Sequence, residues 1–540
     1  MTGNLFNNRR QLFIALASGI GVTLCWFLLT WRYGLDLSDE GYYWYGAQRT
    51  LRGEVPIRDF LAYDIGRYLW AAGIMSLLGD DGIFSARLAA MLYLAITVSA
   101  GVFLVLQAFE TTSGTARKSL LAVVVALLLN LWATPYYKVF DYGTSILIVA
   151  MLVLIMRSLS AARWFGAGLI LGFAAVMGRN HGVYGAASAL LVLGFLLIKG
   201  GQPRAYLRPA IAFIAGTIAG FSPTFVMGAV QPGFMEAFIA GVIEHVHSTT
   251  TATNIPLPIP WSWTRSLAKD GWLLWMNDVL KSTGFVALLL VPALTLFVLL
   301  RKRLDGFTRL HHLLAASAFA GLTYMHYAYS RADVIHLALA IVPMLLILLG
   351  CGIRVRSALP VAAGLLGLSV LAVAQDATVI NSTLMGRPTT VVAVDGSALH
   401  VYPAIADRLR DATAALAAMP EAHDDFLALP DYPGLYAINK SRIGIWEIYA
   451  LSPRDARFEQ AELARLARKP PKIVLLSNHA LDDRPELRYS RMHPLMYAWV
   501  QEHYRRADLS HSGELEVYVS RPDVQCADAT AKSPVRRLGF

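Results

Sequence analysis

Two acidic residues stand at the start of a polar segment that directly follows the first long apolar stretch of the sequence. Asp39 and Glu40 follow Ser38, and residues 36–68 hold six carboxylates and five tyrosines between two strongly apolar regions. Acidic residues in the first turn of a helix stabilise its positive end and need no other role. At a membrane boundary, however, partial burial raises the pKa of a carboxylate towards the value that a general base needs. The pattern therefore predicts catalytic carboxylates here, with Asp39 as the base and Glu40 beside it.

A second group of polar residues follows in the same segment. Asp64 and Arg67 lie in Tyr63-Asp64-Ile65-Gly66-Arg67-Tyr68, which places another carboxylate and a guanidinium at the start of a short apolar helix. An arginine can clamp a phosphate with two parallel hydrogen bonds, although it can also reach to lipid headgroups. We predict Arg67 as a ligand of a phosphate, with the Asp64 carboxylate beside it. Three tyrosines of the same segment are further candidates for contact with a substrate: Tyr42, Tyr43 and Tyr63.

Further cationic candidates stand at the predicted outer ends of apolar spans. They are Lys138, Arg179 with His181, and Arg331. The outer side of a membrane protein is usually the poorer in basic residues, so these side chains need an anionic partner. A substrate phosphate, an anionic lipid or an internal ion pair, such as Arg331 with Asp333, would supply one. We predict that these four residues help to bind the donor phosphate.

The sequence predicts neither a metal site nor a cofactor. His245 and His247 are two residues apart, so on a helix they do not share a face, and no third ligand accompanies them. Cys25, Cys351 and Cys526 form no CxxC motif and no disulfide framework.

Composition points to a membrane protein. Of the 540 residues, 56% are hydrophobic and only 16% are charged, whereas about a quarter are charged in a soluble protein. The net charge of +10 gathers in short loops between apolar runs, as orientation signals do. The basic balance therefore indicates a partner bilayer and no nucleic acid.

About 11 apolar runs are long enough to cross the hydrocarbon core, which takes about 20 residues. Arg9 and Arg10 precede the first run, so the N-terminus is expected in the cytoplasm and the loop 32–80 outside. An odd number of spans then places the C-terminus outside as well. The predicted spans are 11–31, 83–109, 118–134, 143–157, 164–178, 183–198, 209–230, 284–300, 311–327, 335–352 and 357–374.

The chain divides into a membrane part and a C-terminal domain. Residues 1–375 form the transmembrane domain, whose loop 32–80 carries two predicted interfacial helices, 39–51 and 68–78. Residues 376–524 alternate short strands (426–429, 473–476, 515–519) with helices (402–418, 457–468, 493–505), which predicts a small extracytoplasmic α/β layer. Residues 525–540 are predicted to be disordered. The fold class is thus mainly α and polytopic, with a small α/β domain.

These features resemble a known family. A first outer loop with an Asp-Glu pair, two interfacial helices, about a dozen spans and a C-terminal outer domain is similar to the GT-C glycosyltransferases. More specifically, it resembles the superfamily of protein O-mannosyltransferases and the lipid A aminoarabinose transferase, including Ser85-Ala-Arg-Leu88 at the second span. The resemblance covers nearly the whole chain in architecture, while the matching motifs are concentrated in residues 36–90.

The resemblance implies a function and assigns roles. It implies inverting transfer of a sugar from a polyprenyl-phosphate donor to a hydroxyl of a glycan, lipid or protein, on the outer face of a bacterial inner membrane and without a cofactor. Asp39 corresponds to the family's first-loop aspartate and Asp64 to its second acidic position. The aminoarabinose transferases carry a Glu-Lys-Pro run where this chain has Asp64-Ile65-Gly66, so Arg67 takes the place of the lysine.

Two other classes of function were weighed. A transporter of lipids or lipid-linked sugars without catalysis would have paired broken helices at mid-membrane and ionisable residues within its spans. The predicted spans carry almost no charge away from their ends, which disfavours transport. An outer-face sensor with a membrane anchor does not explain so many spans.

Overall fold

The structure is a computed structural model that describes residues 2–109, 114–247, 267–419, 425–510 and 515–521. The chain forms two compact units, Met1–Thr249 with Thr253–Pro403 and Thr250–Ala252 with Ala404–Phe540. This division falls after Pro403, later than the predicted boundary at 375/376, because a β-hairpin beyond residue 376 belongs to the first unit. The predicted disordered tail, 525–540, lies outside the described residues.

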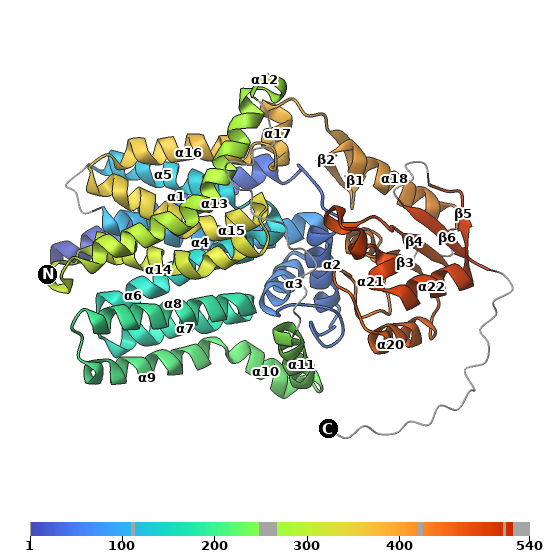
Figure 1. Cartoon of the computed structure of the whole chain (residues 1–540), viewed down its shortest axis with the longest axis horizontal. Helices are drawn as coiled ribbons and strands as arrows, with labels where there is room; N and C mark the ends of the chain where they lie inside the picture. The colour runs from blue at the N-terminus through green and yellow to red at the C-terminus, as the bar shows by residue number, and fades with distance from the viewer. Residues whose placement is uncertain (1, 110–113, 248–266, 420–424, 511–514, 522–540) are drawn as a thin grey trace. The chain divides into compact units, whose positions relative to one another are not determined.

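Unit 1 is a bundle of long helices (Figure 1). Seven helices of the described segments have the length and apolar composition to cross a membrane, or up to 9 if each of two bent pairs is one span. The seven are α1 (Thr2–Thr30), α4 (Ile83–Ala108), α5 (Thr115–Trp132), α6 (Val139–Arg157), α8 (Arg179–Ile198), α13 (Trp272–Leu300) and α15 (Val334–Arg354). The bent pairs are α9 (Pro203–Gly220) with α10 (Ser222–Val230), at 45°, and α16 (Ala358–Val373) with α17 (Thr378–Leu384), at 90°.

The polytopic, mainly helical fold predicted from the sequence is confirmed, although fewer helices than the predicted 11 have the properties of a span. The other two predicted spans are helices in the structure, α7 (Ala161–Met177) and α14 (Arg309–Ser330). α7 has 17 residues, which reach about 26 Å. α14 has 22 residues but includes Arg309, His311, His312 and His326, and these polar side chains lower its hydropathy.

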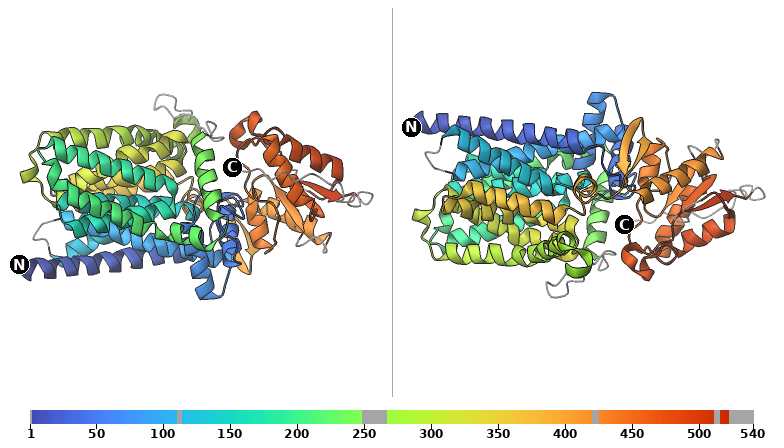
Figure 2. Two further views of the ribbon diagram at one scale, coloured as in Figure 1. Left: turned by 90° about the horizontal axis from the view of Figure 1, so that it is seen from below. Right: turned by 90° about the horizontal axis from the view of Figure 1, so that it is seen from above.

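Two short helices of the first loop, α2 (Asp39–Leu51) and α3 (Gly66–Leu78), lie at the end of the bundle where α6 and α8 begin (Figures 1 and 2). Both helices were predicted, and α3 ends at Gly79 in the left-handed conformation (φ 65°). The aromatic side chains of α2, which was predicted as an interfacial helix, do not face the surface of the protein. Tyr43 and Trp44 are buried in protein, where the Tyr43 hydroxyl donates to the Ala86 carbonyl (3.1 Å) and Trp44 Nε1 to that of Asp81 (2.8 Å).

A β-hairpin that the sequence analysis missed closes unit 1. Strands β1 (Thr390–Val394) and β2 (Ser397–Val401) pair antiparallel around Asp395 and Gly396, which both have positive φ. The hairpin joins the segment after α1, because the His400 amide donates to the Arg32 carbonyl (2.7 Å) and the Gly34 amide to the His400 carbonyl (2.8 Å). The beginning and the end of unit 1 are therefore hydrogen-bonded to each other.

Unit 2 is the predicted small α/β layer. Its four-stranded sheet has the order β3-β4-β6-β5, in which β3 and β4 run parallel and the other pairs are antiparallel. All four residues of β3 and of β4 are buried, so these two strands form the centre of its core. The strands are β3 (Phe426–Leu429), β4 (Ile473–Leu476), β5 (Tyr504–Ala507) and β6 (Glu516–Ser520), and the helices include α18 (Pro403–Ala417), α19 (Pro433–Ile438), α20 (Ala456–Leu466), α21 (Tyr489–Met492) and α22 (Pro494–His503).

Glycines bring α7 and α9 into backbone contact. A Cβ atom on Gly168 would stand 2.0 Å from the Phe213 carbonyl oxygen, and one on Gly216 would stand 2.1 Å from that of Phe165. Gly172 and Gly220 make equally close approaches one turn further on. Small residues at this spacing let helices pack closely where lipid supplies no hydrophobic driving force between them.

This packing predicts that Gly168→Ala destabilises the protein. The added methyl group meets backbone that cannot move aside, so the two helices must separate, at a cost of about 1–3 kcal/mol. The matched control is Gly166→Ala on the same helix, where a Cβ atom meets nothing within 4 Å. Thermal unfolding in detergent should show a lower midpoint for the first variant only, and equal midpoints would contradict the close packing.

Candidate active site

Arg87 of α4 fixes the segment that carries the predicted base. Its guanidinium makes two hydrogen bonds to Glu40, Nε to Oε1 at 2.7 Å and Nη2 to Oε2 at 2.8 Å. It also donates to the carbonyl oxygens of Trp31 and of Gly34, the latter at 2.8 Å. Arg87 and Glu40 are 2% and 4% exposed. Glu40 is therefore a structural partner of Arg87, and it does not face a cavity.

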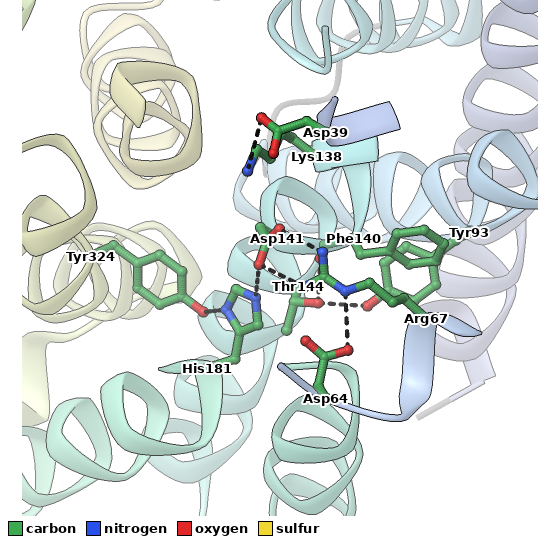
Figure 3. Close-up of polar contacts among 10 residues, drawn as sticks. All are labelled: Asp39, Asp64, Arg67, Tyr93, Lys138, Phe140, Asp141, Thr144, His181 and Tyr324. Carbon is green, nitrogen blue, oxygen red and sulfur yellow. Dashed lines mark hydrogen bonds and ion pairs between the residues drawn. The ribbon is translucent and has the colours of Figure 1, made fainter. Parts of the chain in front are cut away.

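Asp39, the neighbouring residue, has a more open environment. Its side chain is 31% exposed, and its Oδ2 lies 3.9 Å from Lys138 Nζ. Lys138 ends the short 3-10 helix Tyr136–Lys138 that precedes α6. The structure thus brings together two site residues that the sequence predicted from separate loops (Figure 3). At 3.9 Å this ion pair is much looser than that between Glu40 and Arg87.

Arg67 lies between two aspartates (Figure 3). Its Nε donates to Asp64 Oδ1 at 3.0 Å, and its Nη1 and Nη2 lie 3.4 and 3.3 Å from the carboxylate oxygens of Asp141. Two carboxylates therefore already balance this guanidinium. Burial raises the pKa of Asp64, although Arg67 opposes that rise.

Asp141 also belongs to a chain of hydrogen bonds with His181 and Tyr324. His181 Nε2 lies 3.1 Å from Asp141 Oδ1, and His181 Nδ1 lies 2.8 Å from the Tyr324 hydroxyl. His181 is fully buried. We had expected His181 to bind phosphate, but here it orients Asp141.

Some of the side chains described above line a pocket of about 160 Å³ within unit 1. Its charged lining consists of three basic residues (Arg67, Lys138 and Arg179) and two acidic residues (Asp64 and Asp141). Arg179, at the N-terminus of α8, forms no ion pair with any residue that the structure describes. The remaining lining residues are Tyr63, Gly178, Asn180, Tyr327, His336 and Leu339.

The other predicted site residues are divided between the pocket and the core. Tyr63 lines the pocket and is 46% exposed. Tyr42 and Tyr43 are 7% and 3% exposed and pack inside unit 1 without lining it. Arg331 pairs with Asp333 (2.5 Å), which is the internal ion pair considered as its alternative.

Two polar lining residues, Asp141 and His336, were missed by the sequence analysis. Asp141 follows Lys138 by three residues, and residues at that spacing lie on the same face of a helix, so the pair could have been found. His336 was not predictable in this way, since it reaches the pocket from α15. Its Nδ1 lies 2.8 Å from Asp333 Oδ1. Burial would raise the pKa of Asp333, but its bonds with His336 and Arg331 outweigh burial and hold that pKa at about 2.

Asp36 is a further carboxylate beside the predicted base. Its Oδ1 accepts a hydrogen bond from the Ser38 amide (2.9 Å), and its own amide donates to Glu40 Oε2 (3.3 Å). Burial, followed by the nearby charge of Asp39, raises the pKa of Asp36 to about 7. This carboxyl group therefore changes its charge near neutral pH.

The site combines cations suited to an anionic group with carboxylates suited to proton transfer. Within the described ranges, no group of three or more His, Cys, Asp or Glu side chains is placed to hold a metal ion.

Comparison with known proteins gave matches only among solved structures. No protein-family model matches the sequence, and no curated protein does. ArnT from Cupriavidus metallidurans in the apo state superposes with a TM-score of 0.47 at 12% identity, over 94% of this chain and 96% of that one. The apo oligosaccharyltransferase from Archaeoglobus fulgidus has a TM-score of 0.42 at 12% identity, over 96% and 75%. The archaeal oligosaccharyltransferase AglB from Archaeoglobus fulgidus, in complex with an inhibitory peptide and a dolichol-phosphate, gives 0.40 at 10% identity, over 96% and 75%. At these TM-scores the similarities assign neither a family nor an activity to this chain.

The environment of Glu40 predicts a structural effect of its replacement. Glu40→Gln leaves Arg87 buried without its charge partner, which costs about 3–5 kcal/mol. Arg87→Gln should cost a similar amount, and the double variant should lose less than the sum of the two. Thermal midpoints of the four proteins in detergent measure this coupling. A Glu40→Gln protein with wild-type stability but no activity would instead show that Glu40 takes part in the chemistry.

Asp36 predicts a pH dependence of stability. In the folded protein Asp36 keeps its proton up to about pH 7, whereas an unfolded aspartate loses it near pH 4. The folded state thus binds more protons in this interval, and the contribution of Asp36 to stability falls as pH rises from about 4 to about 7. Asp36→Asn removes this loss, so its thermal midpoint should exceed that of the wild type by more at pH 8.5 than at pH 5. The same difference at both pH values would refute the assignment.

Proposed function

We propose that this protein is an inverting glycosyltransferase that moves a sugar from a polyprenyl-phosphate donor to a hydroxyl of an envelope glycan, lipid or protein. The observation that carries the proposal is the pocket of unit 1, which is lined by Lys138 and Arg179 together with Asp64 and Asp141. Asp39 does not line this pocket, but its Oδ2 lies 3.9 Å from Nζ of the lining residue Lys138. In the reaction the bond between the anomeric carbon and the phosphate oxygen breaks, and the acceptor oxygen bonds to that carbon. The acceptor proton goes to a carboxylate, and polyprenyl phosphate leaves.

The cations of the pocket have different parts in this proposal. A leaving phosphate is stabilised by fixed positive charge in a site that excludes water. Arg67 is already balanced by Asp64 and Asp141, so its main part is to orient those carboxylates. Lys138 and Arg179 are left to receive the phosphate. This proposal reduces the predicted phosphate ligands to Lys138 and Arg179. His181 and Arg331 then act as positioning residues.

Asp39 is the proposed base. Its side chain is accessible, unlike that of Glu40, and its contact with Lys138 is loose at 3.9 Å. A donor phosphate that draws Lys138 towards itself would weaken this contact, and the Asp39 carboxylate would accept the proton from the acceptor hydroxyl.

The site is proposed to face the outside of a bacterial inner membrane. Arg9 and Arg10 lie in α1 just before its apolar stretch, and basic residues at 301–303 follow α13. The positive-inside rule places these positions in the cytoplasm. The loop with Asp39 and the start of α8 with Arg179 then lie on the outer side, as does the C-terminal unit. An apolar tail of the donor could approach the pocket from the bilayer.

Transport without chemistry is the alternative, and the bent helices bear on it. A transporter would have its breaks near the middle of the membrane. α9 runs for 18 residues and α16 for 16 before the bend, which is about 24–27 Å of a core of roughly 30 Å. The ionisable residues Asp141 and His181 lie in the first turns of α6 and α8. Breaks and charges near helix ends favour an interfacial reaction site.

The proposal predicts that Asp39→Asn abolishes transfer while the protein still inserts and folds. The gene would be deleted and restored with wild-type, Asp39→Asn or Asp59→Asn versions, and envelope glycans and lipid-linked sugars would be analysed by mass spectrometry. Asp59 is the matched control, because its side chain is 29% exposed, compared with 31% for Asp39, and it pairs with Arg58 outside the pocket. We expect Asp39→Asn to lower the rate of sugar transfer by at least about 100-fold. The glycan should then lack one sugar residue, and the lipid-linked donor of that sugar should accumulate.

Two results would contradict the proposal in different ways. If Asp39→Asn restored the glycan pattern to within a few-fold of wild type, Asp39 would not be the base. If deletion of the gene changed no glycan and no lipid-linked sugar, the protein would not be a glycosyltransferase.

A further inference from the structure

Unit 2 contains a second basic pocket, which the proposed reaction does not use. It has a volume of about 260 Å³ and lies between the C-terminal end of α20, the loop after α19 and the segments that lead into β3 and β4. Three basic side chains, Arg442, Arg465 and Lys469, and one acidic side chain, Asp425, provide its charged lining. Ile443, Gly444, Leu466 and Pro471 complete the lining.

Part of this charge has a structural explanation. Basic residues at the end of a helix interact favourably with its C-terminal carbonyl groups, and Arg465 and Lys469 stand at the end of α20. Lys469 also pairs with Asp425 at the rim of the pocket. These contacts account for Lys469 and Arg465 without any ligand.

Arg442 is not explained in this way. It belongs to the loop after α19 rather than to α20, it is exposed, and it forms no ion pair with a residue that the structure describes. It nevertheless brings a third positive charge to the same cavity, where like charges repel one another. An anion between the three side chains would turn that repulsion into attraction.

Arg465 retains the capacity to bind such an anion. Its partner Glu462 is buried and already accepts hydrogen bonds from the amides of Trp446 (2.8 Å) and Glu447 (3.2 Å). The Glu462 charge is therefore shared between two backbone donors and Arg465, whose side chain stays 40% exposed. A guanidinium has five N–H donors, so further donors of Arg465 can face the cavity.

We propose that this pocket binds a phosphate group carried by the acceptor, with Arg442, Arg465 and Lys469 as its ligands. The phosphate can belong to a water-soluble glycan or to a lipid headgroup, and the chemistry of recognition is the same for both. Assignment of the ligand to the acceptor rests on the proposed function, whereas the anion site itself does not. The apolar floor formed by Leu466 and Pro471 suits the ring face of a phosphorylated sugar.

Hydrogen–deuterium exchange of the full-length protein in detergent tests this inference, with glucose 1-phosphate as the probe and glucose as the uncharged control. The phosphate compound should slow exchange in peptides that cover 440–446 and 466–472, and glucose should not. In the double variant Arg442→Gln/Lys469→Gln, the same slowing of exchange should need a concentration of glucose 1-phosphate that is about tenfold higher or more. Arg410→Gln is the matched control, since Arg410 is exposed and pairs with Asp407 outside the pocket.

Further arms separate the sources and the two proposals. Slower exchange of the same peptides in nanodiscs with phosphatidic acid, but not in phosphatidylcholine alone, supports a lipid headgroup. An effect of glucose 1-phosphate alone supports a soluble glycan. Absence of an effect in both arms, or an undiminished effect in the double variant, overturns the inference. Because the readout needs no transfer activity, Asp39→Asn should keep the effect, and failure of the proposed enzyme would not remove it.

Discussion

The end of unit 1 that carries the candidate site depends on one buried ion pair, between Arg87 and Glu40. Arg87 comes from the second long helix of the chain, yet its guanidinium binds the carbonyl groups after α1 and the carboxylate at the start of α2. A charge that is removed from water must be compensated by its neighbours, so these segments are held in one arrangement. Arg87 fixes Glu40, and because Asp39 is the neighbouring residue in the same helical turn, its position is fixed as well.

The pocket shows the same principle with a different balance. Arg67 is neutralised by two aspartates, and His181 and Tyr324 support the second of them. This inner group has no surplus of positive charge. Lys138, which Asp39 contacts only at 3.9 Å, and Arg179 add positive charge at its edge. Such a division between closely paired inner charges and more loosely held outer cations leaves the site able to bind an anion.

The sequence predicted the elements of this fold better than their contacts. Long apolar runs determine most of the spans. The helix α2 has its predicted bounds, 39–51, and begins with the acidic residues Asp39 and Glu40, which favour a helix start. The hairpin 390–401 was missed, although Asp395–Gly396 is a common two-residue hairpin turn. Its short strands resemble loop sequence when read alone, because their pairing partners are not evident from composition.

The site was predictable to the extent that its chemistry lies within single segments. Asp39 and Asp64 could be found from their loop, whereas the difference between Asp39 and Glu40 could not. Adjacent residues of a helix point in different directions, and only the fold reveals that Arg87 faces one of them. In the same way, His181 was predicted to bind phosphate because it stands at the predicted outer end of a span. Its contact with Tyr324 could not be foreseen, because Tyr324 is more than a hundred residues away in the sequence.

The pairing of His400 with Arg32 and Gly34 has a consequence for how the protein is made. The loop after α1 leaves the ribosome early, but its strand partner is synthesised only after every helix of the bundle. Until then the backbone at 32–34 lacks two of its final hydrogen bonds. Maturation of the reactive loop is thus a late event of biogenesis, and a nascent chain that stalls before residue 400 has inserted its helices without completing the segment that leads into that loop.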